Sequence, residues 1–169
     1  FRHFWVRRIR RIVPAAAAMT LATLGLGYVL LFPSDYTSLA RSALFQQIMG
    51  ANVFFWRNTG YFSGRADMMP LLHTWSLAVE EQFYLAYPIL VMLLQRRSKK
   101  LLTWTLASLA ATSFVLSAWM LPRSPSATFF LLPTRAWELL LGGLLWSVPR
   151  VRALASPLGT AVASTLGIL

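Results

Sequence analysis

Long apolar runs separated by shorter polar stretches dominate the pattern of this sequence. The runs cover residues 13–32, 75–94, 101–121 and 127–148, and a further run occupies residues 151–169. Each is close to the roughly 20 residues that an α-helix needs to cross the hydrocarbon core of a bilayer. The pattern therefore predicts an all-α fold, a polytopic bundle of transmembrane helices in a single domain.

The segment between the first two runs, residues 33–73, is more polar, so we expect most of it to form a loop outside the hydrocarbon. Within it, residues 39–56 are moderately apolar and aromatic, which is compatible with an interfacial or re-entrant helix. In the first run, Gly25 and Gly27 are small residues of the kind at which membrane helices pack closely. The chain begins in a basic stretch and stops inside an apolar run, so we expect a fragment of a larger bundle, truncated at both ends.

Clusters of cations lie at the ends of the apolar runs and predict the orientation of the bundle. They occupy residues 7–11, 96–100 and 150–152. An even number of predicted crossings separates each pair of clusters, so all three lie on one face, which the positive-inside rule assigns to the cytoplasm. The polar segment 33–73 then faces outward.

The composition narrows the possible function classes. Apolar residues make up 57% of the chain and charged residues 12%, which excludes an ordinary soluble domain. The formal charge of +11 belongs to helix ends and not to one basic surface, so nucleic-acid binding is not expected. The sequence contains no cysteine, which excludes disulfides, thiolate metal ligands and a cysteine nucleophile from this stretch.

Three of the five acidic residues, Glu80, Glu81 and Glu138, lie in or beside apolar runs. An ionised side chain at membrane depth costs roughly 3 kcal/mol or more unless it faces protein, water or a partner, so each is a functional candidate. Glu138 lies three positions after Arg135 and is expected to pair with it. For Glu80 and Glu81, a catalytic role and an ion pair with an arginine of another helix both stay open.

One helix face gathers groups that can hydrogen-bond a polyol or relay a proton. At about 100° per residue, this stripe contains His73, Ser76, Glu80, Tyr84 and Tyr87. The imidazole at the start of the helix has a second interpretation, because a histidine at the water interface can simply cap the helix.

Three stretches of the chain resemble the acyltransferase-3 family of membrane O-acyltransferases. The central one is the run Leu-His-Thr-Trp-Ser-Leu-Ala-Val-Glu-Glu-Gln-Phe-Tyr-Leu at residues 72–85, followed by Tyr-Pro at residues 87–88. Residues 4–14 are similar to the R-x-x-R stretch of the family, and residues 133–139 to its Arg-x-Trp-Glu-Leu segment. The order and the separation of the three stretches also match, and the resemblance covers essentially the whole chain.

The resemblance implies an enzyme that moves an acyl group, usually acetyl, from acyl-CoA on the cytoplasmic side to a hydroxyl of a glycan or lipid-linked sugar outside. It also implies that this O-acetylation modifies polysaccharides of the cell envelope, from a bacterial inner membrane. The expected partners are the lipid bilayer, acyl-CoA as a donor substrate and the glycan acceptor. No bound cofactor and no metal are expected.

The resemblance further implies roles for individual residues. Glu80, together with His73 and Glu81, is expected to orient or deprotonate the acceptor hydroxyl. Arg8 and Arg11, one turn apart at the cytoplasmic mouth, are expected to hold the phosphates of acyl-CoA by charge-assisted hydrogen bonds. Substrate contacts are assigned to Ser76, Tyr84, Trp75 and Gln82. Arg135 and Glu138 are expected to position the residues that contact the substrate.

Some interpretations compete with these assignments. Trp75 lies near a helix end and also fits an interfacial anchor. The catalytic histidine of the family lies on its first transmembrane helix and has no counterpart here, since His3 lies in the basic stretch before the third helix, so we expect this fragment to be inactive alone. Two other functions stay open. The protein could be a proton-coupled transporter or exporter with Glu80 and Glu81 as relay groups, or a non-catalytic membrane subunit that serves in assembly.

Overall fold

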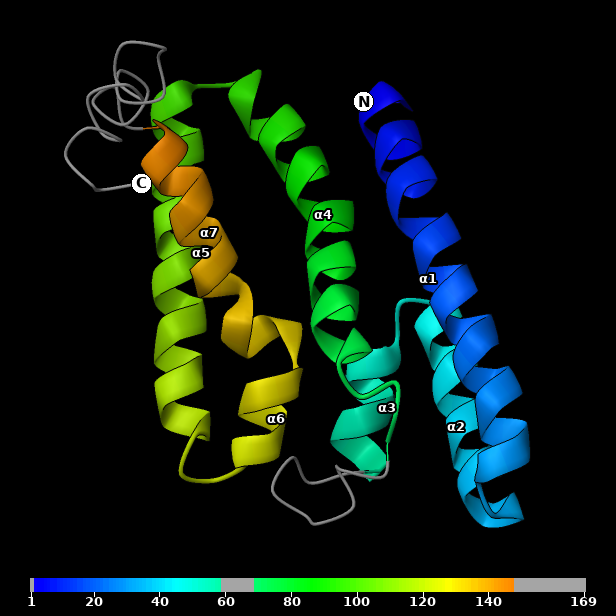
Figure 1. Cartoon of the computed structure of the whole chain (residues 1–169). Helices are drawn as coiled ribbons and strands as arrows, with labels where there is room; N and C mark the ends of the chain where they lie inside the picture. Colours follow the sequence, from blue (N-terminus) through cyan, green and yellow to red (C-terminus); the bar gives the residue numbers. More distant parts are fainter. Residues whose placement is uncertain (1, 59–68, 148–169) are drawn as a thin grey trace, which may run out of the picture. The chain divides into compact units, whose positions relative to one another are not determined.

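All regular elements are α-helices in the part of the chain that the computed structural model describes, residues 2–58 and 69–147 (Figure 1). The predicted all-α fold is confirmed. The predicted run 151–169 and the cationic cluster at residues 150–152 lie outside the described residues, as does a part of the segment 33–73.

The chain forms two compact units, and each is described by itself. The first consists of Phe1–Pro88 and Ser124–Leu132, and the second of Ile89–Arg123 and Pro133–Leu169. The residues with predicted roles near the start of the chain and on the acidic helix belong to the first unit. Arg135 and Glu138 belong to the second.

The longest helix is α1, Arg2–Leu30, which starts well before the predicted run 13–32 and takes in the basic stretch. Pro14 lies inside it, although a proline has no N–H to give to the helix. Membrane helices tolerate such an interruption more readily than soluble ones. Because α1 is continuous, the same helix carries both the arginines and the apolar segment.

The second helix, α2, Pro33–Gln47, packs against α1 at a glycine. A Cβ atom at Gly27 would lie 2.5 Å from Leu39 Cδ2, so any larger residue would require the leucine to move. Gly25, by contrast, has no neighbouring atom within 4 Å of such a Cβ position among the described residues. The predicted close packing is therefore confirmed for Gly27, and the described residues show no such contact at Gly25.

Two short helices, α3, Ala51–Asn58, and α6, Pro125–Phe130, complete the core of the first unit. A turn separates α2 from α3, and in it Met49 adopts a φ of 58° ahead of Gly50. Residues 39–56 therefore form parts of two helices, where the sequence predicts one interfacial or re-entrant helix. The buried core of the unit consists of Leu39, Ala43, Ala51, Phe54, Phe55, Leu71, Ala78 and Phe130.

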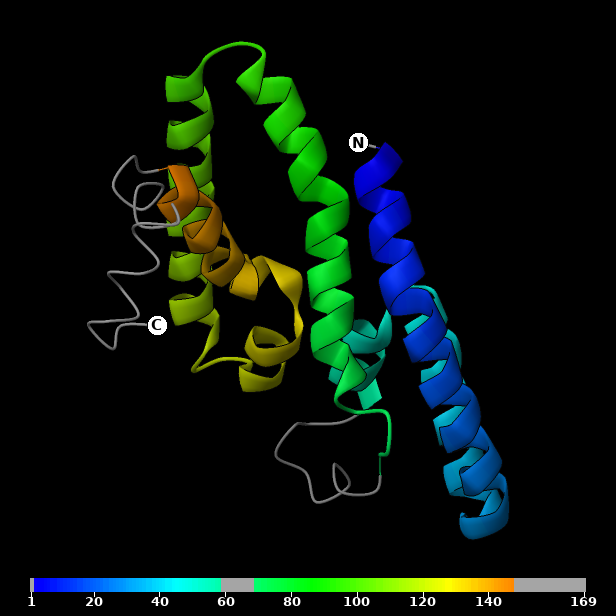
Figure 2. The same ribbon diagram turned by 45° about the horizontal axis from the view of Figure 1, so that its top comes forward.

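The acidic helix is α4, Thr74–Gln95. Its first half lies beside α1 and runs in the opposite direction, as both ribbon views show (Figures 1 and 2). This arrangement brings the arginines of α1 alongside the glutamates of α4.

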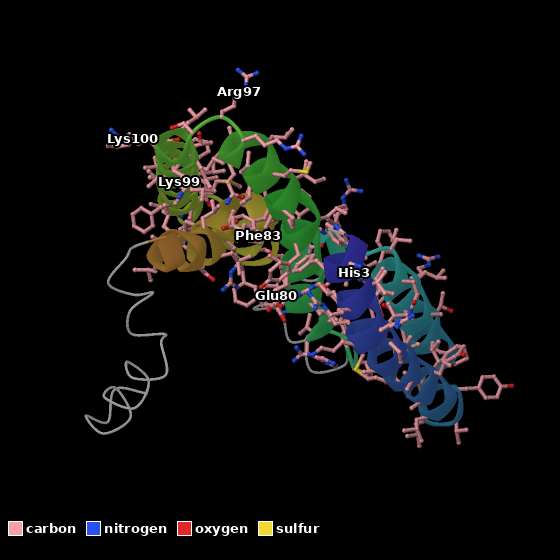
Figure 3. The ribbon with its side chains drawn as sticks, turned by 90° about the horizontal axis from the view of Figure 1, so that it is seen from above. His3, Glu80, Phe83, Arg97, Lys99 and Lys100 are labelled. Carbon is pink, nitrogen blue, oxygen red and sulfur yellow. The ribbon has the colours of Figure 1, made fainter. Side chains whose placement is uncertain are left out.

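The second unit contains α5, Lys99–Met120, and most of α7, Leu132–Ser147. Ser113 on α5 donates a hydrogen bond to the Pro133 carbonyl oxygen at 2.7 Å and accepts one from the Trp137 N–H at 3.0 Å. An α-helix would join these two backbone groups directly, so the serine hydroxyl is inserted into the first turn of α7. At the connection before α5, the side chains of Arg97 and Lys100 point outward (Figure 3).

The run 127–148, predicted as one spanning helix, is two helices in the structure. Between α6 and α7, Leu131 is extended, with φ −93° and ψ 141°. Pro133 explains the break, because proline lacks the N–H and its ring clashes with the carbonyl four residues earlier. In the described part of the chain, three helices are long and apolar enough to cross a membrane, namely α1 from His3, α4 and α5.

Candidate functional site

An ion pair joins α1 to α4, about two turns into each helix. Arg8 Nε donates a hydrogen bond to Glu81 Oε1 at 2.8 Å. The two side chains are only 20% and 13% exposed, so each charge depends on the other for neutralisation. The structure thus shows the ion pair of Glu81 with an arginine of another helix, and its predicted catalytic role stays a prediction.

The same guanidinium stacks on an aromatic ring of α4. Arg8 Cζ lies 3.7 Å from the centroid of the Tyr84 ring, within the range of a cation–π interaction. The ring of Phe4 lies 6.4 Å from the Tyr84 ring, centroid to centroid, in a tilted arrangement. Arg8 is thus held by the Glu81 carboxylate and by the ring of Tyr84, and its predicted contact with acyl-CoA stays a prediction.

Glu80 has different surroundings from its neighbour. Its Oε2 lies 3.9 Å from Arg8 Nη2, and its side chain is 51% exposed. Successive side chains on a helix point about 100° apart, so only one of two adjacent glutamates can face Arg8 closely. Glu80, labelled in Figure 3, is therefore the carboxylate that an approaching molecule can reach.

A cavity of about 550 Å³ lies at this exposed carboxylate. Its lining consists of Phe4, Arg7, Arg8, Arg11, Ile12 and Glu80. Three guanidinium groups face one carboxylate, which favours an anionic ligand. Arg8 is engaged by Glu81, whereas Arg7 and Arg11 form no ion pair with any described residue and are available to bind such a ligand.

His73 lies apart from this cavity. Its Nε2 is 3.2 Å from Met19 Sδ, and its carbonyl oxygen accepts a hydrogen bond from the Ser76 hydroxyl at 3.2 Å. Seven positions on a helix span about 10 Å along the axis, which puts the imidazole out of direct reach of Glu80. The predicted stripe therefore exists as a helix face, but the cavity is lined by only one of its members, Glu80.

Trp75 and Gln82 make contacts within the core of the first unit. The Trp75 ring packs on Phe129 and Phe130 of α6, with centroids 4.5 and 5.4 Å away. Gln82 Nε2 donates to Asn52 Oδ1 at 2.8 Å and to the Met49 carbonyl oxygen at 2.7 Å. Both side chains connect α4 to neighbouring helices, so these contacts support the shape of the site.

Arg135 and Glu138 form the predicted pair on one helix of the second unit. Arg135 Nη2 lies 2.9 Å from Glu138 Oε2 and 3.2 Å from the other carboxylate oxygen. The expected neutralisation at a spacing of three residues is confirmed.

Two residues that line or support the site were not identified from the sequence. Arg7 lines the cavity, and the regular alternation of the basic stretch gave no reason to prefer it over Arg10. Asn52 is 1% exposed and fixes Gln82, and the available signal was the one amide in the apolar, aromatic residues 48–56. Buried polar side chains are hydrogen-bonded as a rule, so such an isolated asparagine indicates a partner elsewhere in the fold.

Comparison with known proteins decides the family. The whole chain, residues 1–169, matches the family model described as an acyltransferase domain, Acyl_transf_3. The chain belongs to the acyltransferase-3 family. The resemblance drawn from the three sequence stretches is confirmed.

Several relatives of this acyltransferase-3 chain are O-acetyltransferases by name. It is 34% identical over 162 residues to YrhL of Bacillus subtilis, a candidate peptidoglycan O-acetyltransferase, covering 89% of the chain and 25% of that protein. It is 31% identical over 179 residues to the peptidoglycan O-acetyltransferase OatA of Listeria monocytogenes, covering 99% and 28%. The O-acetyltransferase OatA of Staphylococcus aureus is 32% identical over 152 residues, covering 84% and 24%.

The chain thus spans about a quarter of the length of these relatives. No solved structure matches it. The family and the three long apolar helices together identify a part of an integral membrane protein.

Proposed function

We propose that this chain is part of a membrane O-acyltransferase that transfers an acyl group, acetyl in the first place, from acyl-CoA to a hydroxyl of an extracytoplasmic glycan. The names of the relatives support peptidoglycan as the acceptor. The observation that carries the proposal is the cavity where arginines of α1 surround the exposed carboxylate of Glu80. An anionic donor and a hydroxyl acceptor are the two substrates that such a lining suits.

On the donor side, Arg7 and Arg11 bind the phosphates of acyl-CoA. Guanidinium groups match phosphate oxygens with two parallel N–H donors, and both side chains border the cavity without an ion-pair partner among the described residues. Arg8, which the sequence paired with Arg11 in this role, instead fixes Glu81 and Tyr84 in place.

On the acceptor side, Glu80 accepts a hydrogen bond from the glycan hydroxyl and orients it for attack. The hydroxyl oxygen bonds to the acyl carbon, the carbon–sulfur bond of the thioester breaks, and CoA leaves as a thiol that carries the hydroxyl proton. Atoms and charge balance without a redox partner or a metal. The Arg8–Glu81 ion pair next to Glu80 fixes α1 relative to α4, so that donor and acceptor bind in the same cavity.

Arg11→Ala tests the donor site. In vesicles with the intact membrane protein, this change is expected to raise the KM for acetyl-CoA about tenfold, since a hydrogen bond to a charged group contributes roughly 1.5–3 kcal/mol. Transfer of labelled acetyl from acetyl-CoA to the glycan is the measurement. Arg10→Ala is the matched control, because Arg10 lies beside Arg11 on α1 but does not line the cavity.

The control is expected to leave the KM unchanged. Equal KM values for the two variants would contradict the phosphate-binding role of Arg11. Proton flux across the vesicle membrane without any release of CoA would contradict the enzyme and favour a transporter.

A further inference from the structure

A second, smaller cavity borders the Arg8–Glu81 pair. It measures about 80 Å³ and lies among α1, the end of α2 and the first half of α4, all within the first unit. Its apolar lining includes Ile12, Val13, Ala16, Leu77 and Ala78. The volume is about half of the ~150 Å³ apolar cavity that holds one benzene molecule, so it has room for roughly three or four non-hydrogen atoms.

Gln46 adds a polar group to this apolar lining. Its Oε1 lies 3.0 Å from the Thr20 hydroxyl, while its Nε2 is buried and has no hydrogen-bond partner among the described residues. A buried donor without an acceptor destabilises a fold unless something else supplies the acceptor. The carbonyl oxygen of a small ligand in the cavity would supply it.

The small cavity adjoins the large cationic one. Arg8 and Ile12 line both, so the two follow one another along α1. From Phe4 to Ala16, the outermost lining residues on this helix, the distance is about 18 Å at 1.5 Å per residue. A long donor molecule can therefore lie along α1 with its anionic end at the arginines and its other end among the apolar residues.

We propose that the small cavity holds the acyl group of the donor thioester and limits the chain that the enzyme accepts to about two or three carbon atoms. Gln46 Nε2 donates a hydrogen bond to the acyl carbonyl oxygen, and Leu77 and Ile12 close the space beyond the methyl group. This inference rests on the proposed acyltransferase function and adds the choice of acyl chain to it.

Leu77→Ala tests the limit, since it lengthens the cavity on the α4 side. Vesicles with the intact protein are given acetyl-CoA or butyryl-CoA, and acyl transfer from each is measured. The wild type is expected to prefer acetyl, and Leu77→Ala to raise the butyryl-to-acetyl ratio about tenfold or more, because one methylene in an apolar pocket changes discrimination by roughly 10- to 200-fold. Leu85→Ala, the same change at an exposed position of α4 outside the cavity, is expected to keep the wild-type ratio.

Acetyl transfer by each variant shows that it is folded. If Leu77→Ala loses acetyl transfer, Ile12→Ala makes the same enlargement from α1. If the wild type transfers butyryl as fast as acetyl, the small cavity does not limit the acyl chain, whatever the variants do. The same conclusion follows if an enlarged variant is active but keeps the wild-type butyryl-to-acetyl ratio. A wild type that transfers neither acyl group overturns the proposed function instead.

Discussion

Glu80 and Glu81 follow one another on α4 and yet have different surroundings, because a helix turns adjacent side chains about 100° apart. Glu81 is 13% exposed and hydrogen-bonds Arg8, which also stacks on Tyr84. Glu80 is half exposed and borders the cationic cavity. We therefore propose two separate tasks, in which Glu81 stabilises the site and Glu80 binds a substrate.

Replacing each glutamate by glutamine separates these tasks. Glu81→Gln is expected to lower the free energy of unfolding by about 1.5–3 kcal/mol, since Arg8 loses its charged partner in a largely buried place. Glu80→Gln is expected to change it by less than about 0.5 kcal/mol, as for most exposed positions, but to reduce acyl transfer strongly. Thermal unfolding in detergent and transfer from labelled acetyl-CoA are the two measurements.

Two results would count against this division of tasks. An equal loss of stability in both variants would mean that Glu80 is also a structural partner of Arg8. Full transfer activity in Glu80→Gln would mean that the acceptor hydroxyl does not depend on this carboxylate.

At the scale of elements, one buried amide holds three helices together. Asn52 on α3 donates to the Phe130 carbonyl oxygen at the end of α6, at 3.2 Å, and accepts from Gln82 on α4 at 2.8 Å. Gln82 in turn reaches the Met49 carbonyl oxygen in the turn before α3. These directed hydrogen bonds specify the positions of the short helices α3 and α6 more strictly than apolar contacts do.

Asn52→Ala is expected to lower the free energy of unfolding by about 1–3 kcal/mol, because it removes the hydrogen bonds of this buried amide to Gln82 and to the Phe130 carbonyl oxygen. Asn58→Ala is the matched control, because Asn58 is exposed and, among the described residues, its side chain bonds within its own helix, to the Phe54 carbonyl oxygen at 2.8 Å. The midpoint of thermal unfolding in detergent distinguishes the two. Similar midpoints for both variants would show that the three-helix connection contributes little.

At the scale of the whole molecule, the order of helices and charges defines a topology that labelling can test. These 169 residues contain no cysteine, so an introduced cysteine has no competitor within them. Ser38 lies on α2, Ser98 between α4 and α5, and Ser124 after α5, each separated from the next by one candidate span. The positive-inside rule places Ser98, beside Arg97 and the lysines that follow, in the cytoplasm.

With a membrane-impermeant maleimide, Ser38→Cys and Ser124→Cys are expected to react in intact cells, because the predicted orientation puts both on the outward side. Ser98→Cys is expected to react only after the membrane is permeabilised. Labelling of all three from outside, or of Ser98→Cys alone, would contradict the assigned orientation.

The apolar runs and the three family stretches were enough to predict an all-α membrane bundle, its family and the helix that carries the acids. The fold and the acidic helix follow from length, from period and from the cost of charge in a bilayer, which act on each segment by itself. The family follows from the resemblance of the three stretches. The pair of Arg135 and Glu138 could be predicted for the same reason, because its partners share one helix.

Contacts between helices were decided only by the tertiary structure. Periodicity gives the direction of a side chain around its own axis, but not which helix lies opposite, so the choice of Glu81 over Glu80 as the partner of Arg8 could not be read from the sequence. The same holds for Asn52, whose partners lie on helices far away along the chain, and for the small cavity, which exists only where three helices meet.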